Sequence, residues 1–349
     1  MVMGNSLGNK KVEDEVIDNI DVLNETGKFV ISYSRSVNFN LYGYENNKYT
    51  NLRIPYTIIK HAKSVRKKGV REACYEVFHR PDKSPTLRSM LDLWGFDTYA
   101  DYLYTICELG FLEGLIPVID FGFLTPDELK QLYDIAAIVK VPLFTDYDLL
   151  MGQDSIRSLN KSFDIKEKVL TWSSKLSFPT STGFFAHSKI EKSQYKEWGN
   201  VIADHINEYG VIHEVVISTK PRLNNIDYKP LTPTQSVSLY DSIRSIIPDH
   251  VPVIFSEPDL KVLEAQLSNK ERDIGAFTDA FLSSESGQIY WQSLNQVIQS
   301  KGLTLQQRFP LKYEFIKDQS YSKKLGQVFD AYKYKIKKAL LEKQKELKQ

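Results

Sequence analysis

The chain has 349 residues, and its 45 lysines and arginines almost balance its 44 aspartates and glutamates, so no bulk field attracts nucleic acid or a membrane surface. A hydrophobic content of 42% and a charged content of 26% are typical of a globular protein, and the longest apolar runs fall short of the roughly 20 residues that a membrane span requires. Two cysteines, Cys74 and Cys107, exclude a disulfide framework and, with no signal-peptide pattern in residues 1–10, predict a cytoplasmic protein.

Eight short apolar segments alternate with segments of helical spacing. Residues 1–27 are an acidic lead, residues 28–316 carry the alternation, and residues 317–349 form a tail. Thr125-Pro126 and Thr232-Pro233 are N-cap and first-turn pairs that predict helix starts. Strands alternating with helices predict an α/β fold, a TIM-type (β/α) barrel. The expected strands are residues 29–33, 72–77, 115–119, 141–145, 182–185, 214–218, 251–255 and 273–277.

The tail predicts a basic amphipathic helix. Lysines surround an apolar face that consists of Val328, Phe329, Tyr332, Ile336, Leu340 and Leu341. This helix either packs on the barrel or offers a basic surface to an anionic partner, and the sequence leaves both interpretations open.

Working residues of such a barrel lie at the carboxyl ends of its strands. His79 and His187 stand at two of these ends, and imidazole is the commonest general base and metal ligand, so with Asp120 they are the candidate catalytic residues. No H-x-x-x-H or H-x-H spacing accompanies them, so no metal site is predicted, and ordinary partly buried polar side chains are the simpler interpretation. The ligand-binding candidates at the other strand ends are Tyr33, Arg35, Glu76, Asp146, Ser218, Lys220 and Glu257.

Aromatic residues are expected to crowd the same end of the barrel. They either fill the space by packing or stack on a flat heterocycle. The residues concerned are Tyr42, Tyr44, Tyr49, Phe78, Phe121, Phe123, Phe144, Tyr147, Phe184 and Phe185.

Several segments, in order, resemble the CofG half of FO synthase, the radical S-adenosylmethionine (SAM) family that closes the deazaflavin ring. Residues 31–37 resemble its first barrel strand, residues 71–82 the second, and residues 94–129 the units that follow. Residues 177–185, 209–217 and 273–276 resemble its fifth, sixth and eighth strands, and residues 303–315 its strand-like tail. The resemblance covers roughly residues 28–316 and implies a barrel of the radical SAM superfamily.

The departures from this family concern its cofactors. The family binds a four-iron cluster through a C-x-x-x-C-x-x-C motif after the first strand, because iron–sulfur clusters require thiolates. The corresponding residues 38–47 contain no cysteine, and the sequence leaves open whether residues 42–45 replace the motif or the loop is shortened. Phe78 and His79 stand where the family has Gly-Glu, and residues 187–190 where it has a Gly-Ile-Gly-Glu turn that approaches the cosubstrate.

We therefore expect neither an iron–sulfur cluster nor S-adenosylmethionine as a cofactor. The resemblance then implies a pseudoenzyme, either a partner of an intact radical SAM synthase half or a binder of a deazaflavin-related small molecule, with no nucleic-acid or membrane partner. Two alternatives stay open. One is an enzyme with a rebuilt barrel mouth that uses acid/base or metal-assisted chemistry, and the other is a structural subunit without a ligand.

Overall fold

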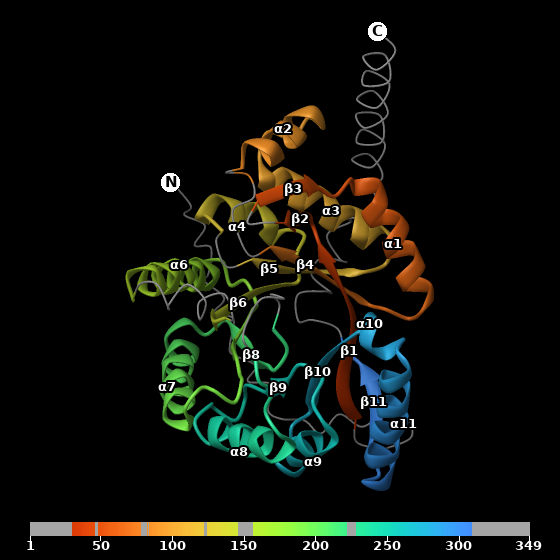
Figure 1. Cartoon of the computed structure of the whole chain (residues 1–349), viewed down its shortest axis with the longest axis vertical. Helices are drawn as coiled ribbons and strands as arrows, with labels where there is room; N and C mark the ends of the chain where they lie inside the picture. Colours follow the sequence, from red (N-terminus) through yellow and green to blue (C-terminus); the bar gives the residue numbers. More distant parts are fainter. Residues whose placement is uncertain are drawn as a thin grey trace, which may run out of the picture.

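The computed structural model describes residues 30–45, 48–77, 82, 84–121, 124–145, 156–221 and 228–308. One parallel sheet has nine strands, and eight of them follow the order β10-β1-β4-β5-β6-β7-β8-β9 and curl into a nearly closed barrel (Figure 1). The predicted TIM-type fold is confirmed, and each of the eight predicted strands overlaps an observed one. The strands are β1 (Val30–Asn40), β4 (Glu72–Val77), β5 (Ile116–Phe121), β6 (Ile138–Phe144), β7 (Thr180–Phe185), β8 (Ile212–Ser218), β9 (Val253–Phe255) and β10 (Asp273–Thr278).

Helices surround the strands, as Figure 1 shows. The two Thr-Pro signals start helices as predicted, because Thr125 and Thr232 each close a capping box, with Glu128 and Gln235 respectively. The described helices are α1 (Pro55–Lys67), α2 (Pro85–Leu93), α3 (Tyr99–Leu112), α4 (Pro126–Tyr133), α6 (Ile156–Lys175), α7 (Lys192–Tyr209), α8 (Pro233–Arg244), α9 (Leu260–Ser268), α10 (Asp279–Leu282) and α11 (Glu285–Ser300).

Alternation along each strand divides the barrel into an outer and an inner layer. In β1, Val37 and Phe39 join the large core between the sheet and the helices, while Ile31 joins a smaller core under α9 and α11. A third, small apolar cluster of Cys74, Val118 and Ile138 comes from β4, β5 and β6 and faces the interior of the barrel. We call this interior the lumen.

The segment after the first predicted strand differs from expectation. Strand β1 continues to Asn40 and pairs with β4, where Asn38 faces Cys74 and Phe39 faces Tyr75. An antiparallel hairpin of β2 (Tyr42–Glu45) and β3 (Lys48–Leu52) follows directly. Residues 38–40 and 42–45, expected as part of a loop, are therefore strand, because their backbone groups find partners in the sheet and the hairpin.

The predicted strand-like tail is confirmed in part. Residues Thr304–Gln307 form β11, which runs parallel to the first residues of β1, from Val30 to Tyr33. Both the lead of residues 1–27 and the tail of residues 317–349 lie outside the described residues.

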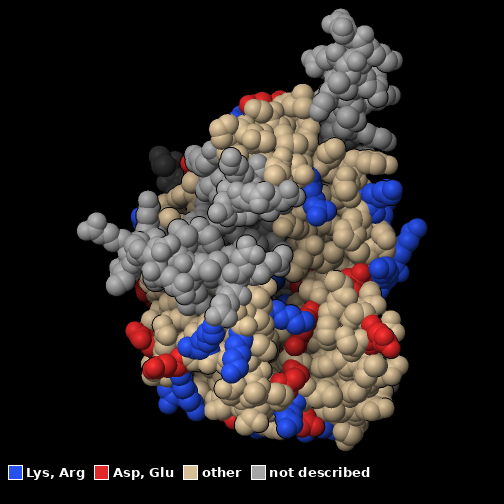
Figure 2. Space-filling view, in the orientation of Figure 1, with Lys and Arg blue, Asp and Glu red and all other residues tan. Residues whose placement is uncertain are grey.

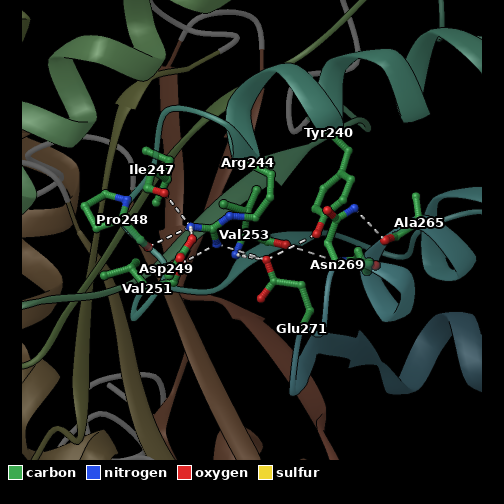
Figure 3. A network of polar contacts seen from close by, with 11 residues as sticks. Tyr240, Arg244, Ile247, Pro248, Asp249, Val251, Val253, Ala265, Asn269 and Glu271 are labelled. Atoms are coloured by element: carbon green, nitrogen blue, oxygen red, sulfur yellow. Dashed lines mark hydrogen bonds and ion pairs between the residues drawn. The ribbon is translucent and has the colours of Figure 1, made fainter. Parts of the chain in front are cut away.

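A polar network outside the barrel ties the end of α8 to the starts of β9 and β10 (Figure 3). Arg244 Nη1 donates to the Val251 carbonyl at 2.7 Å and to Glu271 Oε1 at 3.0 Å. The same carboxyl oxygen of Glu271 accepts from the Tyr240 hydroxyl and from the Val253 N–H, each at 3.2 Å. Because this network lies at the amino ends of the strands, we assign it to stability rather than chemistry.

None of the helices in the described ranges combines the length and the apolar character that crossing a bilayer would need.

Candidate functional site

One arginine lies among three carboxylates at the amino ends of the strands, inside the barrel. Arg308 follows β11, and its Nη1 lies 2.7 Å from Oε2 of Glu214 and 2.9 Å from Oδ2 of Asp273. Its Nε lies 3.4 Å from Oε1 of Glu72. We call these four residues the lumen floor. All four side chains are largely buried, so their charges act in a medium that screens them little.

Lys140 of β6 extends this charged interior. Burial alone would lower the pKa of Lys140, but Coulombic interactions with Cys74 and with the carboxylates of Asp120, Glu214 and Glu72 raise it. The ammonium therefore stays protonated. It can donate hydrogen bonds and stabilise negative charge, but it cannot act as a base or an amine nucleophile, which requires a lowered pKa.

A cavity of about 70 Å³ lies inside the barrel with Lys140 in its wall, and we call it the lumen pocket. Its walls come from β6, β7 and β8 and from residues that follow β8 and β9. They combine the cations Lys140 and Lys220, the hydroxyls of Ser181, Ser218 and Ser256, and the apolar side chains of Pro142, Phe185 and Val216. A few polar groups among apolar walls are typical of a small-molecule site, although this one is smaller than the usual ~300–1,000 Å³.

Three of the predicted ligand-binding residues meet at the rim of the lumen pocket. The Lys220 ammonium contacts the Glu257 carboxylate, and the Ser218 hydroxyl donates to the Lys220 carbonyl at 3.2 Å. The other carboxyl oxygen of Glu257 accepts from Thr278 Oγ1 at 2.6 Å. Glu257 joins β9 to β10 in this way, at the two ends of the strand order. Its φ of 52° is left-handed, a strain of the kind that clusters at functional sites.

His187 is buried in the turn after β7. Its Nδ1 accepts from the Lys189 N–H at 3.3 Å, and its backbone N–H and carbonyl both contact the Tyr195 hydroxyl at 2.7 Å. Its ring stacks on Phe185 at 5.5 Å. These contacts give the imidazole a role in shaping the turn, and its catalytic role stays a prediction.

Tyr33 and Arg35 point away from the lumen. The Tyr33 ring packs on Trp291 of α11 with centroids 5.0 Å apart. Arg35 pairs with Asp279 at 2.7 Å, and Lys68 joins the same carboxylate at 3.3 Å. The end of a strand carries side chains of both faces of the sheet. A prediction that takes every polar residue at a strand end therefore includes residues that point away from the lumen.

Of the remaining candidate residues, some lie in the part of the chain that the structure describes and others do not. Asp120 is buried and faces Glu76 and Lys140 in the register of β4, β5 and β6. His79 and Asp146 lie outside the described residues, as does the side chain of Glu76.

The aromatic residues predicted to crowd the barrel mouth do not all point the same way, because side chains alternate between the two faces of a strand. Phe144 and Phe184 turn their rings to Trp198 of α7, at 4.5 and 5.7 Å, and the same two residues also border the lumen pocket. Phe185 lies in the wall of the lumen pocket, with its ring 5.9 Å from that of Tyr228. The side chains of Tyr42, Tyr44, Tyr49, Phe78, Phe121, Phe123 and Tyr147 lie outside the described residues.

The residues present do not fit a four-iron cluster. The full chain has two cysteines, and none lies between Ser34 and Cys74. Cys74 faces the lumen in β4, whereas Cys107 of α3 belongs to the outer core, and burial raises the pKa of the Cys107 thiol. A buried thiol on each side of a strand cannot supply the set of thiolates that such a cluster needs.

Sequence reasoning missed the lumen floor and Lys140. The available signal was the presence of charged residues inside otherwise apolar strands, as at Glu72, Lys140 and Glu214. Such burial is costly unless the charges are paired, so each of them predicts a partner inside the barrel.

Charge is mixed on the described part of the face that Figure 2 shows. On the described part of the face in Figure 2, Lys and Arg side chains lie among Asp and Glu side chains without a large area of one sign. This agrees with the formal net charge of +1.

Comparison with known proteins relates this barrel to one enzyme. The chain is 24% identical over 281 residues to a 7,8-didemethyl-8-hydroxy-5-deazariboflavin synthase of Methanosarcina acetivorans, an alignment that covers 76% of this chain and 82% of that one. A synthase of the same name from Archaeoglobus fulgidus is 22% identical over 317 residues, 87% of this chain and 97% of that one. The chain is thus a distant homologue of these FO synthases, and the predicted resemblance is confirmed. No protein-family model matches it.

Among solved structures, an HMG-CoA lyase of Brucella melitensis is similar over 79% of this chain and 93% of that one, at 10% identity and a TM-score of 0.45. A likeness at that score carries no argument about function.

Proposed function

We propose that this chain is a cluster-free homologue of FO synthase that acts as a binding protein or partner subunit and not as a radical enzyme. One observation carries the proposal. The segment where the resembling family holds its cluster is here the end of β1 and a hairpin, and no cysteine lies in it. The homologous synthases are named for making a deazaflavin, so a deazaflavin or its precursor is the first ligand to test.

Anaerobic reconstitution tests the loss of radical chemistry. The full chain and an FO synthase homologue are treated side by side with iron and sulfide, and iron content and visible absorption are measured. We expect a cluster in the homologue and none in this chain. Stoichiometric iron with a thiolate-to-iron absorption band in this chain would overturn the proposal.

Binding is tested by titrating the full chain with 7,8-didemethyl-8-hydroxy-5-deazariboflavin and following the fluorescence of the deazaflavin. Partner function is tested by co-purification with a tagged FO synthase homologue. The binding and partner role fails if neither the deazaflavin nor the synthase homologue associates with the chain.

A rebuilt enzyme site is the second candidate, favoured by the protonated Lys140 in the wall of a pocket whose rim contains the strained Glu257. Lys140 would serve as a fixed positive charge and His187 as the proton carrier. Under this reading, His187→Ala removes an activity and leaves stability unchanged. Under the binding reading, the same change costs about 1 to 3 kcal/mol of stability because the buried turn loses a hydrogen-bond acceptor. We expect the loss of stability.

A further inference from the structure

The lumen pocket is sized for the end of a ligand. Its volume of about 70 Å³ is roughly half of the ~150 Å³ cavity that holds benzene in another protein. This partly open space takes a functional group of about three or four heavy atoms, so the rest of a larger ligand would extend out of it.

The chemistry of the walls limits which group this is. Lys140 and Lys220 border the pocket, and Lys220 is already paired with Glu257 at the rim. Val216 and Phe185 contribute apolar wall between them. A cationic group entering the pocket would meet the Lys140 ammonium, so the wall disfavours positive charge.

An anionic group is also disfavoured, because neighbouring carboxylates already balance the positive charge of Lys140. Asp120, Glu72 and Glu214 act on its ammonium, and their charges raise its pKa. Arg308 is the cation that the lumen floor adds, and it is shared among Glu72, Glu214 and Asp273. Among these lumen residues, four acidic side chains face two cations. Burial raises the pKa of Asp273, but the other three acids still outnumber the cations, so a further negative charge would be repelled by the acids behind Lys140.

An uncharged acceptor avoids both penalties. A carbonyl oxygen can take a hydrogen bond from the ammonium without adding charge to the lumen, and a hydrogen bond to a charged donor is stronger than one between neutral groups. We propose that the lumen pocket binds the neutral carbonyl end of a small molecule, with Lys140 as its donor and as the residue that sets this charge preference.

This inference rests on the proposed binding role, and its test can fail separately. Three aromatic probes of similar size carry different charges on the group that enters the pocket. Benzamide is neutral, benzoate is negative, and benzylamine is positive and lacks a carbonyl oxygen. Binding to the full chain is measured by ligand-observed NMR with competition among the probes. We expect benzamide to bind about tenfold more tightly than either charged probe, because the lumen carboxylates repel benzoate and the Lys140 ammonium repels benzylamine.

Two variants test whether the probes bind in the lumen pocket. Lys140→Met removes the donor and leaves the acids, so benzamide binding should fall about tenfold and benzylamine should become the preferred probe. Lys168→Met, which removes an exposed lysine from α6, is the matched control and should change nothing. Because Lys140→Met can also fail to fold, Val216→Phe provides a second variant. It fills the apolar wall, should abolish binding of all three probes, and leaves every lumen charge in place.

Three results would overturn the inference. They are a preference for benzoate, unchanged benzamide binding in both the Lys140→Met and Val216→Phe proteins, and no binding of any probe. A preference for benzoate would leave the binding role intact and reverse only the charge of the ligand. Cluster reconstitution tests the proposed loss of radical chemistry independently of all three.

Discussion

Arg308→Met should strongly destabilise the fold, because it leaves three buried carboxylates without their guanidinium. The contacts at 2.7 Å to Glu214 and 2.9 Å to Asp273 are charge-assisted hydrogen bonds, and Glu72 lies 3.4 Å away. Removing one member of a buried ion pair typically costs about 3 to 5 kcal/mol, since the other charge stays buried and unpaired. We expect a loss in this range, which is a large fraction of the ~5 to 15 kcal/mol that a folded domain has in total.

The assay is urea unfolding of the full chain at neutral pH, compared with two other variants. Arg308→Lys keeps the charge but cannot reach several carboxylates at once, so it should lose less than Arg308→Met. Arg88→Met removes an exposed ion pair with Asp92 and an exposed hydrogen bond to the Asp97 carbonyl, and should cost at most about 1 kcal/mol of unfolding free energy.

The same variant has a pH signature. Burial alone would raise the pKa of Glu214, but Arg308 and Lys140 lower it below its usual value. A lowered carboxyl pKa stabilises the native state above the unfolded-state pKa, and this stability is lost as the pH falls through the folded-state pKa. Without Arg308 that contribution disappears, so the difference in unfolding free energy between the native protein and the variant should stay constant from pH 7 to about pH 5. It should narrow as the pH falls further, toward the lowered pKa of Glu214. A gap as small as that of Arg88→Met, or one that does not change with pH, would refute this account of the lumen floor.

Three further predictions concern single positions. Gly183→Ala should lower the unfolding free energy by more than about 3 kcal/mol, because the new Cβ would lie 1.8 Å from the Val216 carbonyl oxygen. Gly302→Ala has open space around the new Cβ and should lower it by about 1 kcal/mol, and thermal unfolding of both variants measures the difference. Glu257→Gly should be more stable than Glu257→Ala by about 1 kcal/mol, because both lose the same contacts but only glycine relieves the left-handed φ; equal stabilities would contradict the strain. Burial raises the pKa of Glu108 to about 7, so the native protein loses stability as the pH rises from the unfolded-state value toward 7. Glu108→Gln should then be more stable by about 1 to 2 kcal/mol at pH 8 and nearly neutral at pH 4, and a pH-independent difference would count against the buried acid.

The strands could be predicted because parallel strands buried on both faces appear as short apolar runs between helical segments. Their inward and outward faces could not be assigned in the same way. Along β1 the large residues Val37 and Phe39 join the outer core, and the residues of alternate parity are small, as at Ser34 and Ser36. A rule that selects polar residues at strand ends cannot separate Arg35, which faces outward, from Ser218, which borders the lumen pocket.

Arg308 shows a second limit of the sequence. Its role depends on β11 returning to the first residues of β1, more than 270 positions earlier in the chain, and only that pairing brings its side chain to Glu72 and Glu214. The charged residues inside β4 and β8 indicated that a cation must enter the barrel. Nothing in their local sequence indicated that it would come from the end of the described chain.

The segment where the resembling family has its cluster loop contributes here to the barrel itself. Asn38 to Asn40 continue β1 and pair with β4, and Phe39 stacks on Tyr75 with ring centroids 5.4 Å apart. Leu41 and Leu52, on either side of the hairpin, are fully buried. The segment that could have been a cofactor loop thus contributes backbone pairing and apolar contact to the sheet. Placing cysteines in it would not rebuild a cluster site, because a loop able to wrap iron would have to give up those hydrogen bonds and that buried surface.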